Sequence, residues 1–154
     1  AVASLVRGVG PFTLRTPHTG MMSYAEGTTK IPHGSLAPED TARLRRWQIR
    51  GVTPRLRLHF GGHYEGEVAS RNLLAEIKGR EKPEEIIVIG GHSDSWDVGQ
   101  GAQDDGGGIV SAWEALRLMR QLHLQPRRTI RVVMWTHEEF GGLGAQAYRT
   151  MHAA

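Results

Sequence analysis

Runs of apolar residues divide the second half of the chain into two strands and one helix. Residues 86–89 are four β-branched residues in a row, which is typical of a strand buried on both faces of a sheet. Residues 129–136 form a second apolar run, and between the two runs apolar residues recur every three or four positions. This spacing predicts a helix over about 106–122 that ends before Pro126. Strand, helix and strand in this order predict a right-handed βαβ crossover with parallel strands.

The first half of the chain has weaker patterns. Pro38-Glu39-Asp40 places proline and two acids where a helix begins, and we expect this helix to end near Gly51. Strict alternation of polar and apolar residues over 55–60 predicts a half-buried strand, with residues 72–77 as its antiparallel partner. The predicted fold class is therefore α/β, in which antiparallel strands extend a parallel core.

Length, charge and composition exclude several classes of protein and of metal site. The 154 residues suit about one domain by length; they carry a net charge of +3 and contain no cysteine, which excludes disulfides and thiolate zinc sites. No apolar run approaches the length of a membrane span. Arginines gather between residues 43 and 57, but a nucleic-acid surface would need a broader basic stripe with stacking aromatics. We therefore expect a solvated face there and no nucleic-acid partner.

Candidate metal ligands follow the predicted strands. His92 comes after the first strand, Asp104 precedes the helix, and Glu138 and Glu139 follow the second strand. In a βαβ unit both strands end at one edge of the sheet and the helix begins there, so these side chains are expected to converge. One imidazole and several carboxylates suit a divalent metal, and of two adjacent glutamates one can bind metal while the other handles protons. Asp94 can orient the imidazole; the competing interpretation is an acidic, solvated edge without a metal.

Three motifs, in this order, resemble those of the zinc exopeptidases of the M28 family. They are Gly91-His92-Ser93-Asp94-Ser95, Gly101-Ala102-Gln103-Asp104-Asp105-Gly106 and Glu138-Glu139. The resemblance implies that His92, Asp104 and Glu139 are zinc ligands, with Asp104 bridging two zinc ions. It also implies that Glu138 is the general base, that Asp94 is the partner of His92, and that a cis peptide precedes Asp105. His137 stands where the family usually has a small residue.

The same resemblance sets expectations for the whole protein. Residues 1–51 are expected to be the latter part of a protease-associated-type insert domain, with residues 1–7 inside a helix, and residues 52–154 the first part of the peptidase domain. The family's remaining aspartate and histidine ligands have no counterpart here, so we expect a fragment that is inactive alone. The longer protein is expected to be secreted or exported, to hydrolyse dipeptides or short peptides with two zinc ions, and to allow a homodimer. The alternatives are a single-zinc acyltransferase of the glutaminyl cyclase kind and a non-catalytic relative that retains the fold.

Overall fold

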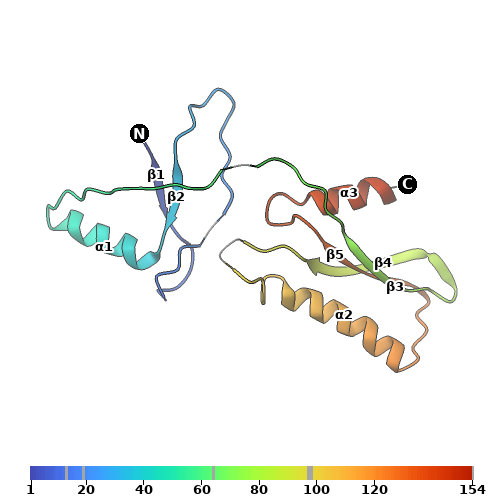
Figure 1. Ribbon diagram of the computed structural model, residues 1–154. Helices are drawn as coiled ribbons and strands as arrows, with labels where there is room; N and C mark the ends of the chain where they lie inside the picture. The colour runs from blue at the N-terminus through green and yellow to red at the C-terminus, as the bar shows by residue number, and fades with distance from the viewer. Residues whose placement is uncertain (13, 19, 64, 97–98, 154) are drawn as a thin grey trace. The chain divides into compact units, whose positions relative to one another are not determined.

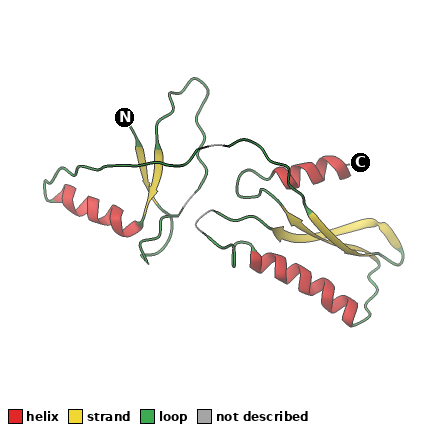
Figure 2. Cartoon of the chain, in the orientation of Figure 1, coloured by secondary structure: helices red, strands yellow, loops and turns green. Residues whose placement is uncertain are grey.

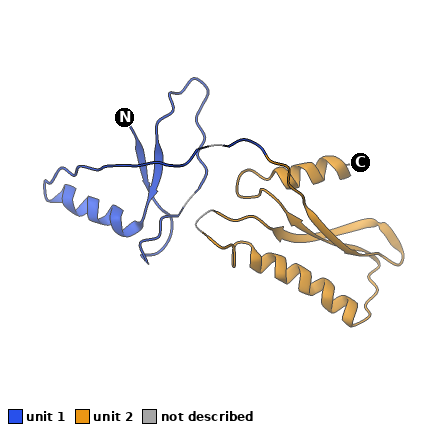
Figure 3. Ribbon diagram, in the orientation of Figure 1, with its two compact units in different colours: residues 1–67 blue, residues 68–154 orange. Residues whose placement is uncertain are grey.

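The computed structural model describes residues 1–12, 14–18, 20–63, 65–96 and 99–153. The chain forms two compact units, Ala1–Glu67 and Val68–Ala154, which Figure 3 shows in different colours. This boundary follows Glu67, whereas the sequence placed a boundary after Gly51. All of the candidate ligands belong to the second unit. No helix in the described ranges is long and apolar enough to cross a membrane.

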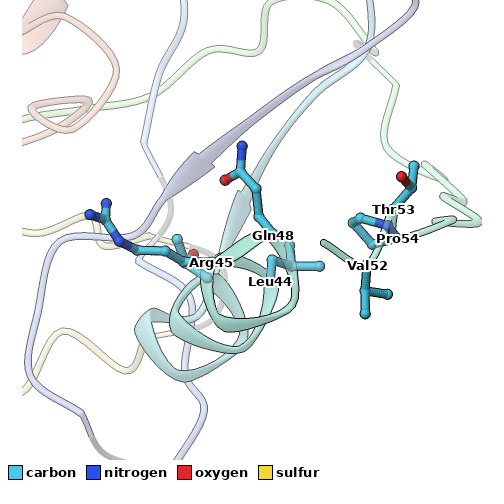
Figure 4. Close-up of a pocket in the computed structure, with 7 residues that line it drawn as sticks. Leu44, Arg45, Gln48, Val52, Thr53 and Pro54 are labelled. Carbon is cyan, nitrogen blue, oxygen red and sulfur yellow. The ribbon is translucent and has the colours of Figure 1, made fainter. Parts of the chain in front are cut away.

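The first unit contains two short parallel strands and one helix. β1 (Ser4–Arg7) pairs with β2 (His33–Leu36). The prediction of a helix over residues 1–7 is therefore wrong. The backbone N–H and C=O groups of β1 form hydrogen bonds with β2 and are not available for a helix. α1 (Pro38–Ile49) begins with proline, as predicted, since proline lacks the N–H that the first turn leaves unpaired. A cavity of about 550 Å³ beside α1 is lined by Thr41, Leu44, Arg45, Gln48, Val52, Thr53 and Pro54 (Figure 4). None of the predicted site residues lines this cavity.

The segment that follows α1 differs from the prediction. Its described part, residues 52–63 and 65–67, forms no strand, so the strand predicted over 55–60 is wrong. Leu56 and Leu58 remain 51% and 40% exposed. Alternating residues become a half-buried strand only where a second strand supplies the hydrogen-bond ladder, and no described residue supplies it here.

The second unit is built on a three-stranded mixed sheet. β3 (Leu73–Ile77), β4 (Lys82–His92) and β5 (Arg128–Trp135) lie in the order β3-β5-β4. β5 runs antiparallel to β3 and parallel to β4. α2 (Gly106–Gln121) connects β4 to β5, which confirms the predicted βαβ core, and α3 (Leu143–His152) follows β5 (Figure 1, Figure 2).

The two helices of the second unit cover opposite faces of its sheet (Figure 1). Val132 of β5 is 1% exposed and packs with Ala112 and Leu116 of α2. The preceding residue, Arg131, points to the other face, where its guanidinium donates to the Tyr148 hydroxyl of α3 at 2.9 Å. Successive side chains of a strand point to opposite faces, so β5 is the strand that is covered on both sides.

β4 lies at an edge of the sheet rather than at its centre. Ile86, Ile87 and Val88 are 39%, 46% and 41% exposed, so the prediction of burial on both faces is wrong for these three residues. The β-branched run predicts a strand correctly, because that preference is local. How many strands pair with it depends on distant parts of the chain, which the run itself does not specify.

Candidate metal centre

The candidate ligands lie where the two parallel strands end. His92 is the last residue of β4 and pairs in register with Trp135, the last residue of β5. Asp104 lies two positions before Gly106, where α2 begins. The crossover therefore brings the loop after β4, the start of α2 and the turn after β5 to one edge of the sheet, as the order of elements predicted.

The predicted ligands form one group. His92, Asp104 and Glu139 each offer one ligand atom, and these atoms lie within 4.8 Å of one another. His92 Nε2 is 3.0 Å from Asp104 Oδ1 and 3.7 Å from Glu138 Oε2. The imidazole is only 11% exposed, whereas the Asp104 and Glu138 side chains are 80% and 54% exposed. The group is thus anchored on a part-buried ring and opens to solvent on its carboxylate side.

The orientation of the imidazole is set by the loop that follows it. His92 Nδ1 lies 2.9 Å from the backbone carbonyl oxygen of Asp94 and 3.6 Å from the Asp94 carboxylate. Because a carbonyl oxygen only accepts, Nδ1 carries the N–H, and Nε2 is directed at the carboxylates. The sequence suggested the Asp94 carboxylate for this role, but the closer acceptor is the carbonyl group of the same residue.

The Asp94 carboxylate is hydrogen-bonded to the turn after β5. Its Oδ1 accepts the backbone N–H of Glu138 at 3.0 Å, and its Oδ2 accepts that of Glu139 at 3.1 Å. One side chain therefore fixes the backbone of both glutamates relative to the loop that holds His92. The spacing of the motif alone did not predict these bonds.

The charges of the site explain the shifted pKa values. Burial lowers the pKa of His92, but the hydrogen bond to Asp94 and the neighbouring carboxylates outweigh it, so the pKa is raised. Burial also opposes ionisation of Asp94, but the N–H groups of Glu138 and Glu139 outweigh it and the pKa of Asp94 is lowered. Burial, followed by repulsion from Asp104, raises the pKa of Glu139. The carboxylates outnumber the imidazole, and a divalent cation would offset this excess of negative charge.

The donor set fits a divalent metal ion. Nε2 of His92 and Oδ1 of Asp104 both present lone pairs when the imidazole is neutral, yet they lie 3.0 Å apart. This contact requires a proton on one of the two atoms or a cation bound by both. One imidazole nitrogen and two carboxylate oxygens are ligands that zinc accepts.

Asp105 is a functional residue that the sequence reasoning did not single out. Its Oδ2 accepts the backbone N–H of His92 at 3.0 Å, and its Oδ1 accepts that of Gly108 at 3.0 Å, so it caps α2 and holds the end of β4. An added Cβ at Gly91 would lie 2.2 Å from Asp105 Oδ2, so only glycine fits there. An aspartate directly before a predicted helix is the signal that identifies such a cap. The peptide bond between Asp104 and Asp105 is cis, as the resemblance implied.

His137 is not brought into the ligand group. Its backbone adopts a φ of 61°, and its ring lies 5.7 Å from the Phe140 ring. The group of His92, Asp104 and Glu139 does not include it. His137 is therefore a neighbour of the glutamate pair that packs against an aromatic ring.

Fold and site together define an α/β protein with a metal-suited cluster at the carboxyl ends of two parallel strands. The family model described as peptidase family M28 matches residues 72–154, which is more than half of the chain. The chain belongs to peptidase family M28.

Similar proteins extend the match over both units. The chain is 47% identical to carboxypeptidase Q of Xenopus laevis over 152 residues, which cover 99% of this chain and 32% of the relative. Identity to carboxypeptidase Q of Homo sapiens is 45%, with the same shares covered. The crystal structure of a peptidase M28 precursor from Shewanella amazonensis SB2B matches with a TM-score of 0.87 and 39% identity, over 99% of this chain and 35% of that chain. The predicted fold class is confirmed, and the chain spans about a third of the length of the curated relatives it matches.

Proposed function

We propose that this chain carries part of the active site of a zinc-dependent exopeptidase that hydrolyses dipeptides or short peptides. The proposal rests on the convergence of His92, Asp104 and Glu139 within 4.8 Å, with Glu138 beside them. Membership of a peptidase family and similarity to carboxypeptidase Q support the class of reaction.

Three residues of the group would hold zinc. His92, Asp104 and Glu139 supply one nitrogen and two carboxylates, and three protein ligands are typical of a catalytic zinc site. Zinc bound there would lower the pKa of a bound water and polarise the carbonyl of the scissile bond. Asp104, whose side chain is 80% exposed, has the second carboxylate oxygen that a bridging ligand needs. Two zinc ions per whole protein are therefore part of the proposal.

Glu138 is the proposed general base. Its Oε2 lies 3.7 Å from His92 Nε2, beside the ligand atoms rather than among them, and its side chain is 54% exposed. A carboxylate in this place can accept a proton from the attacking water and return it to the leaving amine. Asp94 would support both roles, because it fixes the backbone of Glu138 and Glu139.

Several features of the whole protein remain proposals. We propose that the sequence up to residue 51 is the latter part of a protease-associated-type insert domain, and that residues 52–154 are the first part of the peptidase domain. We also propose that the protein is secreted or exported and forms a homodimer. The similarity to carboxypeptidase Q covers both of these parts of the chain.

Metal analysis combined with kinetics on the full-length protein tests the proposed function. We expect two zinc ions per chain, hydrolysis of unblocked dipeptides, loss of turnover with a chelator and recovery with zinc. His92→Ala should remove zinc and turnover, whereas His59→Ala, a change of the same kind at an exposed position of the first unit, should keep both. A single zinc with acyl-transfer activity would contradict the proposal, as would a folded protein without metal or turnover.

A further inference from the structure

The turn that holds the glutamate pair lies outside regular secondary structure. Residues 136–142 connect β5 to α3. Within this turn Gly141 donates to the carbonyl of Glu138 at 3.1 Å, and Gly142 donates to that of His137 at 2.8 Å. These two bonds fix the shape of the turn but not its place against the loop after β4. The start of the turn is tied to the residue before β3, because the Thr136 N–H donates to Asn72 Oδ1 at 3.0 Å. The position of the glutamates against the loop after β4 depends on contacts between the turn and that loop.

Two adjacent contacts join the turn to the loop. The first is the pair of hydrogen bonds from Glu138 and Glu139 to the Asp94 carboxylate. The second is aromatic: the rings of Trp96 and Phe140 have centroids 4.8 Å apart and an interplanar angle of 57°. Tilted rings at this separation attract each other beyond the effect of burial alone. Trp96 follows Asp94 by two positions and Phe140 follows Glu139 directly, so the two contacts are neighbours along both segments.

We propose that Trp96 and Phe140 are positioning residues for the base Glu138, an inference that rests on the proposed peptidase function. Their contact holds the turn against the loop, so that Asp94 keeps both N–H groups and Glu138 Oε2 stays near His92 Nε2. Neither ring offers a metal ligand, so both act through the backbone of the turn. The two backbone hydrogen bonds inside the turn cannot replace this contact, because neither of them connects the turn to the loop after β4.

Amide hydrogen exchange tests the positioning step without relying on activity or metal. Phe140→Leu keeps an apolar side chain but removes the ring, so exchange at Glu138 and Glu139 should become about 3- to 10-fold faster. The exchange rates of the α2 amides should not change. Phe140→Tyr retains the ring and should retain protection. Phe12→Leu, the same change at a side chain that is 64% exposed in the first unit, is the matched control.

Kinetics on the full-length protein test the link to the base. Phe140→Leu should lower kcat about 3- to 10-fold with little change in KM or zinc content. In a Glu138→Gln background the same substitution should cost almost nothing further, because the group it positions is already gone. A ring that served only general stability would lower the residual activity of both backgrounds by the same factor.

The outcomes separate this inference from the proposed function. Unchanged exchange at Glu138 and Glu139 in Phe140→Leu would overturn the inference, as would equal losses of kcat in both backgrounds. Absence of turnover in the wild-type, zinc-loaded protein would refute the peptidase function instead, and the exchange experiment would still report whether the rings position the turn.

Discussion

Asp94→Asn removes one charge while leaving the size of the side chain unchanged. In the wild-type structure the carboxylate accepts two backbone N–H groups at 3.0 and 3.1 Å, from Glu138 and Glu139, and the side chain is 21% exposed. Asparagine offers one oxygen, so one N–H keeps a neutral acceptor and the other faces an amide NH₂. The substitution therefore converts two charge-assisted bonds, one exposed and one part-buried, into one ordinary bond and one N–H that has lost its protein acceptor.

The magnitude follows from these bonds. A hydrogen bond to a charged group contributes about 1.5–3 kcal/mol and an ordinary one about 0.5–1.5 kcal/mol, and water can pair with a donor that is not fully buried. Allowing for the bond that asparagine retains and for the access of water to the exposed N–H of Glu138, we expect Asp94→Asn to lower the free energy of unfolding by about 1–2 kcal/mol at pH 7. Turnover of the full-length protein should fall as well, because the same bonds position Glu138.

The pH dependence of this loss has a definite sign. The pKa of Asp94 in the folded protein lies below its ordinary value of 3.8, because N–H groups stabilise the carboxylate despite burial. A lowered pKa contributes stability that is present above the unfolded pKa and is lost as pH falls through the folded pKa. The part of the difference between wild type and Asp94→Asn that comes from these two bonds should therefore be present in full well above pH 3.8 and shrink as the pH falls below it.

Urea unfolding followed by circular dichroism, at pH 7 and at several values below 4, measures this difference. Glu114→Gln is the matched control: it removes a carboxylate that pairs with Arg117 on the solvent side of α2, and its effect should be much smaller. An Asp94→Asn protein as stable as wild type at pH 7 would refute the reasoning. So would a stability difference that grows as the solution is acidified.

The remaining predictions concern the proposed general base, one proposed zinc ligand, the packing of β4 against β5, and the activity of the isolated chain. In the full-length protein Glu138→Gln should keep its zinc and lose about 10²–10⁴-fold in turnover, and near-normal hydrolysis would contradict its role. Glu139→Gln should bind less zinc by elemental analysis, since it removes one of three ligands; full zinc content would contradict that. Gly90→Ala should destabilise the protein by about 3 kcal/mol in thermal or urea unfolding, because its Cβ would lie 2.0 Å from the Val133 carbonyl oxygen. Purified residues 1–154 should show no dipeptide hydrolysis with added zinc, and chelator-sensitive turnover would show that this chain suffices.

The sequence predicted the βαβ core because its signals are local. Apolar spacing between 109 and 119 specified α2, and the β-branched run 86–89 specified β4. The parallel pairing expected of a βαβ unit then placed the ends of both strands at one edge, which brought His92, Asp104 and the glutamate pair together. No long-range information was required beyond the order of the elements.

The parts that were wrong depend on neighbours that a local pattern does not specify. Alternation over 55–60 predicted a strand, but no described residue pairs with it. The β-branched run was expected to be buried on both faces, yet β5 occupies the centre of the sheet and β4 an edge. At the site, the motif showed that Asp94 lies close to His92, but not that its carboxylate would bind the backbone of the turn after β5. Contacts between loops depend on backbone geometry and cannot be read from residue spacing.

Two of the three proposed metal ligands, His92 and Asp104, are each followed closely by an aspartate that organises the backbone. Asp94, two residues after His92, accepts N–H groups from the turn with Glu139. Asp105, directly after Asp104, accepts N–H groups from His92 and from the first turn of α2. Each of these two side chains joins segments that carry different proposed ligands. The three ligand atoms are therefore positioned through hydrogen bonds of the backbone, and the atoms themselves stay free to bind a metal. Asp104 and Glu139 lie in loops, and only His92 belongs to a strand. The two loop residues therefore need hydrogen bonds from neighbouring side chains to hold their positions. Loss of either organising aspartate should therefore weaken metal binding although every ligand is still present.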